Sequence, residues 1–257
     1  MATGADTRTD FIIETRGLTK EFSGFAAVKD VNLKVRRGTI HALIGPNGAG
    51  KTTFFNLLTK FLPVTAGQII YNGNDITNVK PAAISRRGMV RSFQISAVFQ
   101  HMSVLDNVRI ALQRPTGMSF HFWKAESTLY RLHARALELL EAVGLADYRD
   151  HLAVELPYGR KRALEIATTL ALDPEMLLLD EPTSGLGHED IDRISSLIKS
   201  VSANRTVLMV EHNLSVVANL SDTITVLTRG QILAEGTYAE VSKNPEVMEA
   251  YMGTGHV

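Results

Sequence analysis

The chain has 257 residues, 45% of them hydrophobic, which is enough for one large domain with a substantial core or for a core that carries a subdomain. Its 27 Lys and Arg residues balance its 27 Asp and Glu residues, so no overall field favours nucleic acid or an anionic membrane. The absence of cysteine excludes disulfides and thiolate metal sites and fits a reducing cytosol.

The N-terminal residues MATGADTRTDF are polar and include acids, which is not the pattern of a secretory signal. No uninterrupted apolar segment of the sequence reaches membrane-spanning length. We therefore expect any association with a membrane to run through a partner protein.

Apolar, β-branched runs alternate with longer helical patterns, which predicts an α/β protein with a mainly parallel sheet. Strand signals begin with FIIETRGL and are frequent in the first and last thirds of the chain. The predicted core strands cover residues 39–44, 176–180, 206–211 and 223–229. Between ITVLTRG and QILAEG, the pair Arg229-Gly230 predicts a hairpin turn.

The middle of the chain, from Ser103 to Leu172, has little strand signal. Its segment ESTLYRLHARALELLEAVGL has helical periodicity instead. This pattern predicts a helical subdomain inserted into the α/β core.

The strongest motif is HALIGPNGAGKTTFFNLL, in which a predicted strand runs into a glycine-rich loop and then a helix. The glycines let backbone N–H groups turn towards phosphate oxygens, and the helix N-terminus adds a positive dipole end. Lys51 can supply a point charge to the β- and γ-phosphates, and the Thr52 hydroxyl can ligate Mg²⁺. The alternative, a chance glycine-rich turn, does not explain the flanking strand and helix.

A second motif, MLLLDEP, places Asp180 and Glu181 at the C-terminal end of a predicted buried strand, where α/β sheets bind ligands. Asp180 can hold Mg²⁺ through water, and Glu181 can polarise an attacking water. An isolated Asp-Glu pair at a strand end is more often a solvated cap. Its combination with the glycine-rich loop favours the functional interpretation.

With GPNGAGKTT, LPYGRKR, LLLDEPTSGL and VEHNL in this order, the chain resembles the ATP-binding subunit of ABC transporters, from about Ile12 to Gly253. It is most similar to the subunits of branched-chain amino acid importers, which typically read RTFQ, YG in the signature and an ending like AYLG. Here stand RSFQ (91–94), YG (158–159) and AYMG (250–253).

The resemblance implies a P-loop NTPase (RecA-like) core with a mainly parallel sheet, an N-terminal antiparallel β subdomain and an inserted α-helical subdomain. Within a single ABC ATPase domain spanning 1–257, residues 11–95 and 173–240 would form the nucleotide-binding core with the β subdomain. Residues 96–172 would form the helical subdomain with the signature, and residues 241–257 a C-terminal tail.

The resemblance also implies ATP and Mg²⁺ as cofactors and assigns residues to them. The nucleotide-binding residues would be Phe22, Val28, Gly45, Asn47, Gly48, Gly50, Lys51, Thr52, Thr53 and Asp180. The catalytic residues would be Glu181, His212 and Gln94, and Mg²⁺ would be held, partly through water, by Thr52, Gln94 and Asp180.

For three of these residues, an alternative interpretation has to be weighed against the assigned role. Phe22 matches the aromatic residue that stacks on adenine, but a plain core phenylalanine would look the same. His212 matches the switch histidine that contacts the γ-phosphate, although a lone strand-end histidine usually has no such role. Gln94 matches the Q-loop glutamine because RSFQ fits the subgroup, whereas Gln100 in VFQH does not.

The signature residues Pro157, Tyr158 and Gly159 would face the ATP bound by the opposite subunit of a dimer. Pro157 lacks the hydroxyl and N–H of the usual serine, and Arg160 stands where glutamine is common. Gly187 replaces an Asp or Asn that usually bridges the dimer interface. These departures are either neutral drift or an impaired contribution to the opposite ATP site.

Impairment would predict an asymmetric heterodimer with a paralogous ATP-binding subunit, in which the site on this chain's own loop remains catalytic; a homodimer would turn over slowly. The other expected partners are transmembrane permease subunits and, indirectly, a periplasmic substrate-binding protein, with no nucleic acid. The expected location is peripheral, on the cytoplasmic face of the inner membrane. The aromatic segment 118–124 (MSFHFWK) fits core packing or a loose loop better than a partner contact.

The expected function is thus ATP hydrolysis that powers import of branched-chain amino acids or related small amino or organic acids. The alternative from another class is a soluble ABC-type ATPase of DNA repair or chromosome maintenance. Such chains usually need long coiled coils, zinc cysteines or a basic face, and the sequence has none of these. A small-molecule P-loop kinase would not need the signature, the Q-loop and the switch histidine together.

Overall fold

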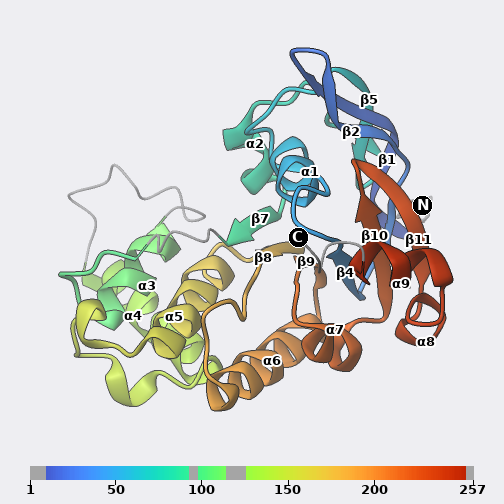
Figure 1. Ribbon diagram of the computed structural model, residues 1–257. Coiled ribbons are helices and arrows are strands. Elements are labelled where there is room, and N and C mark those ends of the chain that lie inside the picture. The colour runs from blue at the N-terminus through green and yellow to red at the C-terminus, as the bar shows by residue number, and fades with distance from the viewer. Residues whose placement is uncertain (1–9, 93–97, 114–125, 253–257) are drawn as a thin grey trace, which may run out of the picture.

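The computed structural model describes residues 10–92, 98–113 and 126–252 (Figure 1). A six-stranded central sheet has the order β11-β10-β4-β9-β8-β7. Its strands are β4 (Ile40–Ile44), β7 (Met89–Ser92), β8 (Met176–Asp180), β9 (Thr206–Val210), β10 (Thr223–Thr228) and β11 (Gln231–Gly236). All neighbouring pairs are parallel except β10 with β11. The predicted α/β fold with a mainly parallel sheet is confirmed.

The four predicted core strands correspond to β4, β8, β9 and β10, each within one residue at either end. The hairpin between β10 and β11 is also confirmed, with Thr228 opposite Gln231 across the turn. Arg229 and Gly230 have φ values of 46° and 79°. Positive φ at both central residues is what a two-residue hairpin turn of type I′ requires.

A second, antiparallel sheet has the order β2-β1-β5-β6, and β3 also pairs with β1. These strands are β1 (Phe11–Phe22), β2 (Phe25–Val31), β3 (Lys34–Arg36), β5 (Ala66–Tyr71) and β6 (Asn74–Asp75). Helix α1 (Lys51–Leu58) shares one hydrophobic core with this sheet and with one face of the central sheet. Phe54 and Phe55 of α1 are fully buried there.

The opposite face of the central sheet packs against helices in a second core. Burial on both faces explains why the central strands read as continuous apolar runs rather than as alternating patterns. Between β7 and β8 come α3 (Val104–Gln113), α4 (Glu126–Ala142) and α5 (Tyr158–Leu170), with the short 3₁₀ turns Ala146–Tyr148 and Ala153–Glu155. They form the helical lobe on the left of Figure 1, so the predicted helical insertion is confirmed.

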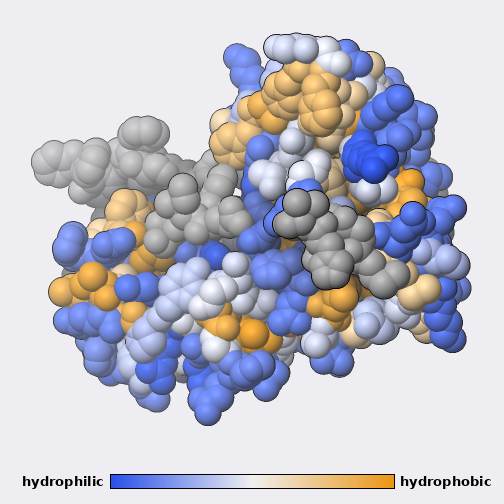
Figure 2. Space-filling view, viewed as in Figure 1, coloured by the Kyte–Doolittle hydropathy of each residue, from blue (hydrophilic) through white to orange (hydrophobic). Residues whose placement is uncertain are grey.

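The remaining helices are α2 (Pro81–Arg86), α6 (His188–Ser202), α7 (Leu214–Leu220), α8 (Tyr238–Val241) and α9 (Pro245–Met252). Across the described ranges, no helix combines the length and the apolar character that crossing a membrane requires. Apolar colour gathers at the top of the molecule in Figure 2, over the end of the β1–β2 hairpin. Phe22 and Phe25, which face each other across this hairpin, are 43% and 67% exposed.

Candidate functional site

Three loops leave the central sheet at the same edge. Strands β4, β9 and β8 are parallel neighbours, and they end at Ile44, Val210 and Asp180. Since the carboxyl ends of parallel strands share one edge, the loops after them converge. The glycine-rich loop, the Asp180-Glu181 pair and His212 are therefore brought together, as the order of strands in the sequence alone could not show.

The glycine-rich loop is shaped by contacts that only glycine permits. At Gly45, φ is 148° and an added Cβ would lie 2.0 Å from the carbonyl oxygen of Leu227. At Gly50, φ is 101° and an added Cβ would lie 2.3 Å from the carbonyl oxygen of Ala27. The loop is thus pressed between β2 and β10, with Asn47 and Gly48 exposed at its tip.

Helix α1 begins directly after this loop. Its N-cap is Gly50, and no side chain caps its first turn. Thr52 is exposed in that turn and Thr53 is partly buried. Uncapped N–H groups at a helix N-terminus, next to a glycine loop, are the arrangement that binds phosphate oxygens.

Lys51 is buried at the start of α1, and its Nζ donates hydrogen bonds to the carbonyl oxygens of Gly45 (2.6 Å) and Pro46 (3.0 Å). Burial lowers the pKa of Lys51, whereas the charges of Glu181 and Asp180 raise it. The loop lysine therefore lies within electrostatic range of both strand-end acids. A lysine cation beside this loop can bind phosphate oxygens, and the two carboxylates can hold a metal ion and accept a proton from water.

Asp180 is buried and forms an ion pair with Arg91 of β7. The other terminal nitrogen of Arg91 donates to Asn56 Oδ1 of α1 at 2.6 Å. The Arg91 guanidinium also lies 5.7 Å from the centre of the Phe55 ring. The motif RSFQ contains Arg91 but does not predict this ion pair, because Asp180 lies 89 residues further along the chain.

Glu181 follows Asp180 in a left-handed conformation, with φ of 47°. Its N–H donates to the carbonyl oxygen of Val210 at 2.9 Å, which ties it to the end of β9. A non-glycine residue at positive φ is uncommon and marks a position that the surrounding structure enforces.

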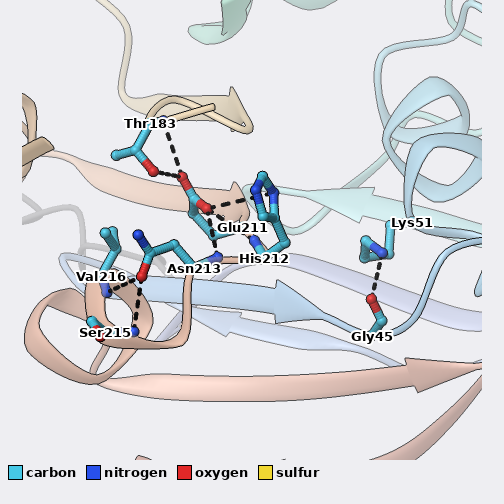
Figure 3. Close-up of polar contacts among 8 residues, drawn as sticks. All are labelled: Gly45, Lys51, Thr183, Glu211, His212, Asn213, Ser215 and Val216. Carbon is cyan, nitrogen blue, oxygen red and sulfur yellow. Dashed lines mark hydrogen bonds and ion pairs between the residues drawn. The ribbon is translucent and has the colours of Figure 1, made fainter. Parts of the chain in front are cut away.

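His212 lies after β9, and its side chain is 60% exposed. Its backbone N–H donates to the carboxylate of the preceding residue, Glu211, at 2.9 Å. Glu211 is fully buried and also accepts hydrogen bonds from Thr183 and Asn213, as Figure 3 shows. Glu211 stands inside the motif VEHNL, but the motif alone does not predict a role for it.

Phe22 and Val28 belong to the strands that lie beside the loop. Val28 is fully buried, and its neighbour Ala27 presents its carbonyl oxygen to Gly50. Phe22 ends β1 and is 43% exposed, with the Lys20 ammonium 5.1 Å from its ring centre. Its exposure argues against the alternative of a core phenylalanine.

The C-terminal segment also reaches the loop. Burial raises the pKa of Tyr251 to about 12, against the opposing effect of a hydrogen bond from the backbone of Gly45. Tyr251 lies in α9, within the ending AYMG. In the sequence, this ending indicates the subgroup but does not predict a contact with the loop.

The signature segment lies at the start of α5, in the helical lobe. Pro157 is the N-cap residue, and no side chain accepts a hydrogen bond there. Tyr158 is 51% exposed and packs against Gly185, where an added Cβ would lie 3.5 Å from its ring. Arg160 stacks on Tyr148, with 4.0 Å between the guanidinium and the ring centre.

Gly159 of α5 lies close to a side chain of α6. An added Cβ would lie 2.3 to 2.6 Å from the carboxylate atoms of Asp190 in α6. The sequence predicts only a close approach of Gly159 to a nucleotide. The packing of α5 against the first turn of α6 also leaves little room for a side chain at this position unless the Asp190 carboxylate moves aside.

Gln94 and the aromatic segment 118–124 lie outside the described residues. Gln100 is exposed, and its carbonyl oxygen accepts a hydrogen bond from the Val154 N–H at 2.9 Å, so it belongs to the helical lobe. Gly187 is the exposed N-cap of α6, with open space around its Cα.

This geometry can be compared with known proteins. Residues 28–184 match the model of the ABC transporter family, and residues 231–257 match that of the branched-chain amino acid ATP-binding cassette transporter. The chain belongs to the ABC transporter family. It is an ATP-binding cassette that hydrolyses ATP, as its sequence predicts.

Relatives of the cassette match it along nearly its whole length. The high-affinity branched-chain amino acid transport ATP-binding protein BraF of Pseudomonas aeruginosa is 39% identical over 249 residues, which are 94% of this chain and 98% of BraF. The corresponding protein LivG of Escherichia coli is 38% identical over 250 residues, with the same coverage. The predicted resemblance to the branched-chain amino acid group is confirmed.

Solved structures agree with the fold of the cassette. The ADP conformation of MJ1267, an ATP-binding cassette of an ABC transporter, superposes with a TM-score of 0.83 at 32% identity. The alignment covers 95% of this chain and 100% of MJ1267. A nucleotide-free cassette of an ABC transporter gives a TM-score of 0.82 at 30% identity, over 94% of this chain and 98% of that one.

Proposed function

We propose that the chain is the ATP-hydrolysing subunit of an importer for branched-chain amino acids or related small amino or organic acids. The observation that carries this proposal is the position of Lys51, whose charge interacts with both Asp180 and Glu181 at one edge of the sheet. The relatives that cover nearly the whole chain transport branched-chain amino acids. The substrate class rests on them, because this subunit does not itself bind the transported molecule.

In this proposal, the loop from Gly45 to Thr53 holds the phosphates of ATP through its backbone N–H groups and Lys51. Phe22 packs on the adenine, and Val28 supports the strand beside the loop. The exposed Thr52 hydroxyl and the Asp180 carboxylate fit a Mg²⁺ ion bound together with the phosphates. Mg²⁺ typically takes only one or two protein oxygens beside phosphate, where it neutralises developing charge. Within the described ranges, no cluster of three or more His, Asp or Glu residues could hold a metal alone.

Hydrolysis requires a water that attacks the γ-phosphate in line with the leaving oxygen. Glu181 would accept a proton from this water, and its position after a forced left-handed turn fits such a role. His212, exposed at the same edge, would donate a hydrogen bond to the γ-phosphate. Gln94 would complete the set from the segment that follows β7.

Two cassettes are proposed to close on ATP, each lending its signature segment to the other. Here Pro157 offers no cap hydroxyl, which supports an impaired contribution to the opposite site. We therefore propose a heterodimer with a paralogous cassette that carries an intact signature. The site on this chain's own loop would be the catalytic one.

A groove of about 850 Å³ fits the docking of a permease. It lies between α2, β7, α3 and α5, and Arg91 of β7 contributes to its floor. Its occupant would be a cytoplasmic helix of the permease, so the cassette would work on the cytoplasmic face of the membrane. Ala82, exposed on α2, offers a test, because Ala82→Arg should block assembly and leave nucleotide affinity unchanged.

The decisive experiment reconstitutes the chain with its permeases and partner cassette in proteoliposomes, and measures ATP hydrolysis and uptake of leucine, isoleucine and valine. ATP-dependent uptake is expected, and Glu181→Gln should abolish hydrolysis and uptake together while ATP still binds. Glu240→Gln, in the exposed cap of α8, is the matched control. Uptake that does not depend on ATP would contradict the proposal, and hydrolysis stimulated by DNA instead of permeases would favour the alternative.

A further inference from the structure

The carboxylate of Glu211, which directly follows β9, accepts four hydrogen bonds from two loops at the sheet edge. One carboxylate oxygen, Oε1, accepts from the N–H of Thr183 at 3.0 Å and from its hydroxyl. The other oxygen, Oε2, accepts from the N–H of His212 at 2.9 Å and of Asn213 at 3.1 Å. Figure 3 shows the carboxylate between these two groups of donors.

The two groups of donors belong to different segments. Thr183 lies two residues after Glu181, in the loop that follows β8. His212 and Asn213 lie in the loop that follows β9, and the Asn213 side chain caps α7 by accepting from the N–H groups of Ser215 and Val216. Glu211 therefore joins the loop after β8 to the loop after β9 and, through Asn213, to α7.

Burial of the Glu211 carboxylate is not explained by stability alone. Removing the carboxylate from water is unfavourable before its hydrogen bonds form, so an apolar residue would serve stability at least as well. What four directed hydrogen bonds provide instead is a fixed spacing between the groups that donate them. These groups include the backbone N–H of Thr183, two residues after the proposed general base Glu181, and that of His212, the proposed γ-phosphate contact.

We propose that Glu211 is a positioning residue for ATP hydrolysis. It holds the loop after β8, which carries Glu181, at a fixed position relative to the loop after β9, which carries His212. This inference rests on the proposed roles of Glu181 and His212. The His212 ring nitrogen Nδ1 lies 4.0 Å from Glu211 Oε2, too far for a hydrogen bond. Glu211 thus acts on His212 through the backbone, and on Glu181 through Thr183.

Glu211→Gln is the sharpest test, because it keeps the volume and replaces one acceptor oxygen with an NH₂ group. That group cannot accept, so either Thr183 or the pair His212 and Asn213 loses its partner. In the assembled transporter, we expect kcat to fall about 10- to 100-fold while the KM for ATP and the affinity for a fluorescent ATP analogue stay within threefold. Glu240→Gln, the matched control, should change neither.

A double-mutant cycle tests whether Glu211 acts on Glu181 through Thr183. Thr183→Val removes only the hydroxyl bond and should lower kcat less than Glu211→Gln does. Combined, the two substitutions should lower kcat no further than Glu211→Gln alone, since both act on one network. Additive losses would overturn the proposed link, as would a kcat of Glu211→Gln within threefold of the unsubstituted transporter.

A merely structural role predicts another result, in which nucleotide affinity falls in parallel with kcat; this too would overturn the proposal. Amide hydrogen exchange of the full chain gives a readout that needs no activity, and we expect faster exchange in Glu211→Gln around both residue 183 and residues 212–213. Unchanged exchange in both segments would overturn the positioning role. Failure of the proposed function is seen separately, as an unsubstituted transporter without ATPase activity or a Glu181→Gln variant with full turnover.

Discussion

Arg91 and Asp180 form an ion pair in the interior of the protein, with side chains only 9% and 3% exposed. The pair joins β7, which leads to residues 93–97, to the end of β8. Arg91 also binds Asn56 of α1, so one guanidinium holds three elements around the carboxylate proposed for Mg²⁺. Its position in the floor of the groove places it between the proposed docking surface and the ATP site.

Arg91→Met should lower the free energy of unfolding by about 3–5 kcal/mol, because it leaves the Asp180 carboxylate buried without its partner. Urea denaturation of the full chain measures this loss. The control is Arg193→Met, which breaks an exposed pair with Asp190 and should cost less than about 1 kcal/mol. Equal losses in the two variants would contradict the assigned importance of the buried pair.

The central strands could be predicted because their physical cause is local. Strands β4, β8 and β9 are buried on both faces, so each appears in the sequence as an uninterrupted apolar run. The glycine-rich loop is equally local, since its strand, glycines and helix are consecutive. The hairpin turn at Arg229-Gly230 follows from two residues alone.

The contacts that position the acids could not be predicted in this way. Arg91 and Asp180 are 89 residues apart, and Thr183 and Glu211 are 28 residues apart. Neither pairing follows from hydrophobic periodicity, because it depends on which strands become neighbours in the sheet. The packing of Gly159 against Asp190 likewise depends on how α5 and α6 meet.

Gly50→Ala should disrupt the phosphate loop more than Gly48→Ala does. Both positions have positive φ, so alanine at either should cost about 1–2 kcal/mol in backbone strain. Only at Gly50 would the added Cβ also meet a backbone atom, the Ala27 carbonyl oxygen at 2.3 Å; Gly48 has open space. Thermal unfolding and ATP-analogue binding of both variants check this. A Gly48→Ala variant as unstable as Gly50→Ala would contradict the steric argument.

His41 should make the stability of the protein depend on pH. Burial lowers the pKa of His41 to about 4 from an ordinary value of 6.5, so the unfolded chain binds the proton more readily. The free energy of unfolding should therefore be highest above pH 6.5 and fall by about 3 kcal/mol as the pH drops towards 4. His41 Nε2 lies 2.7 Å from the Thr225 hydroxyl, which donates to Glu235.

Denaturant unfolding of the full chain between pH 4 and pH 8 measures this dependence. In His41→Gln, the free energy of unfolding should fall less steeply between pH 6.5 and pH 4, because the contribution of His41 is gone. The contributions of carboxylates remain. The same substitution at exposed His188, His188→Gln, controls for the change of residue type. An identical slope in His41→Gln and the unsubstituted chain would contradict a neutral, buried His41.

Pro157→Ser should raise ATP turnover in the reconstituted transporter. At the N-cap of α5, serine can accept a hydrogen bond from a first-turn N–H and can offer its hydroxyl to the opposite ATP, neither of which proline does. The cap should add about 1 kcal/mol of stability, and losing the proline ring should remove about 0.4–1 kcal/mol. The free energy of unfolding is therefore expected to change little, so a higher rate would report on the ATP site.

Pro157→Ala separates the hydroxyl from the ring, because it removes the proline and adds no oxygen. We expect the rate to rise in Pro157→Ser and to stay low in Pro157→Ala, measured at saturating ATP with the partner cassette present. An equal rise of the rate in both variants would mean that the proline ring, not the missing hydroxyl, limits turnover. An unchanged rate in Pro157→Ser would show that Tyr158, Gly159 and the helix N-terminus already provide what the opposite site needs.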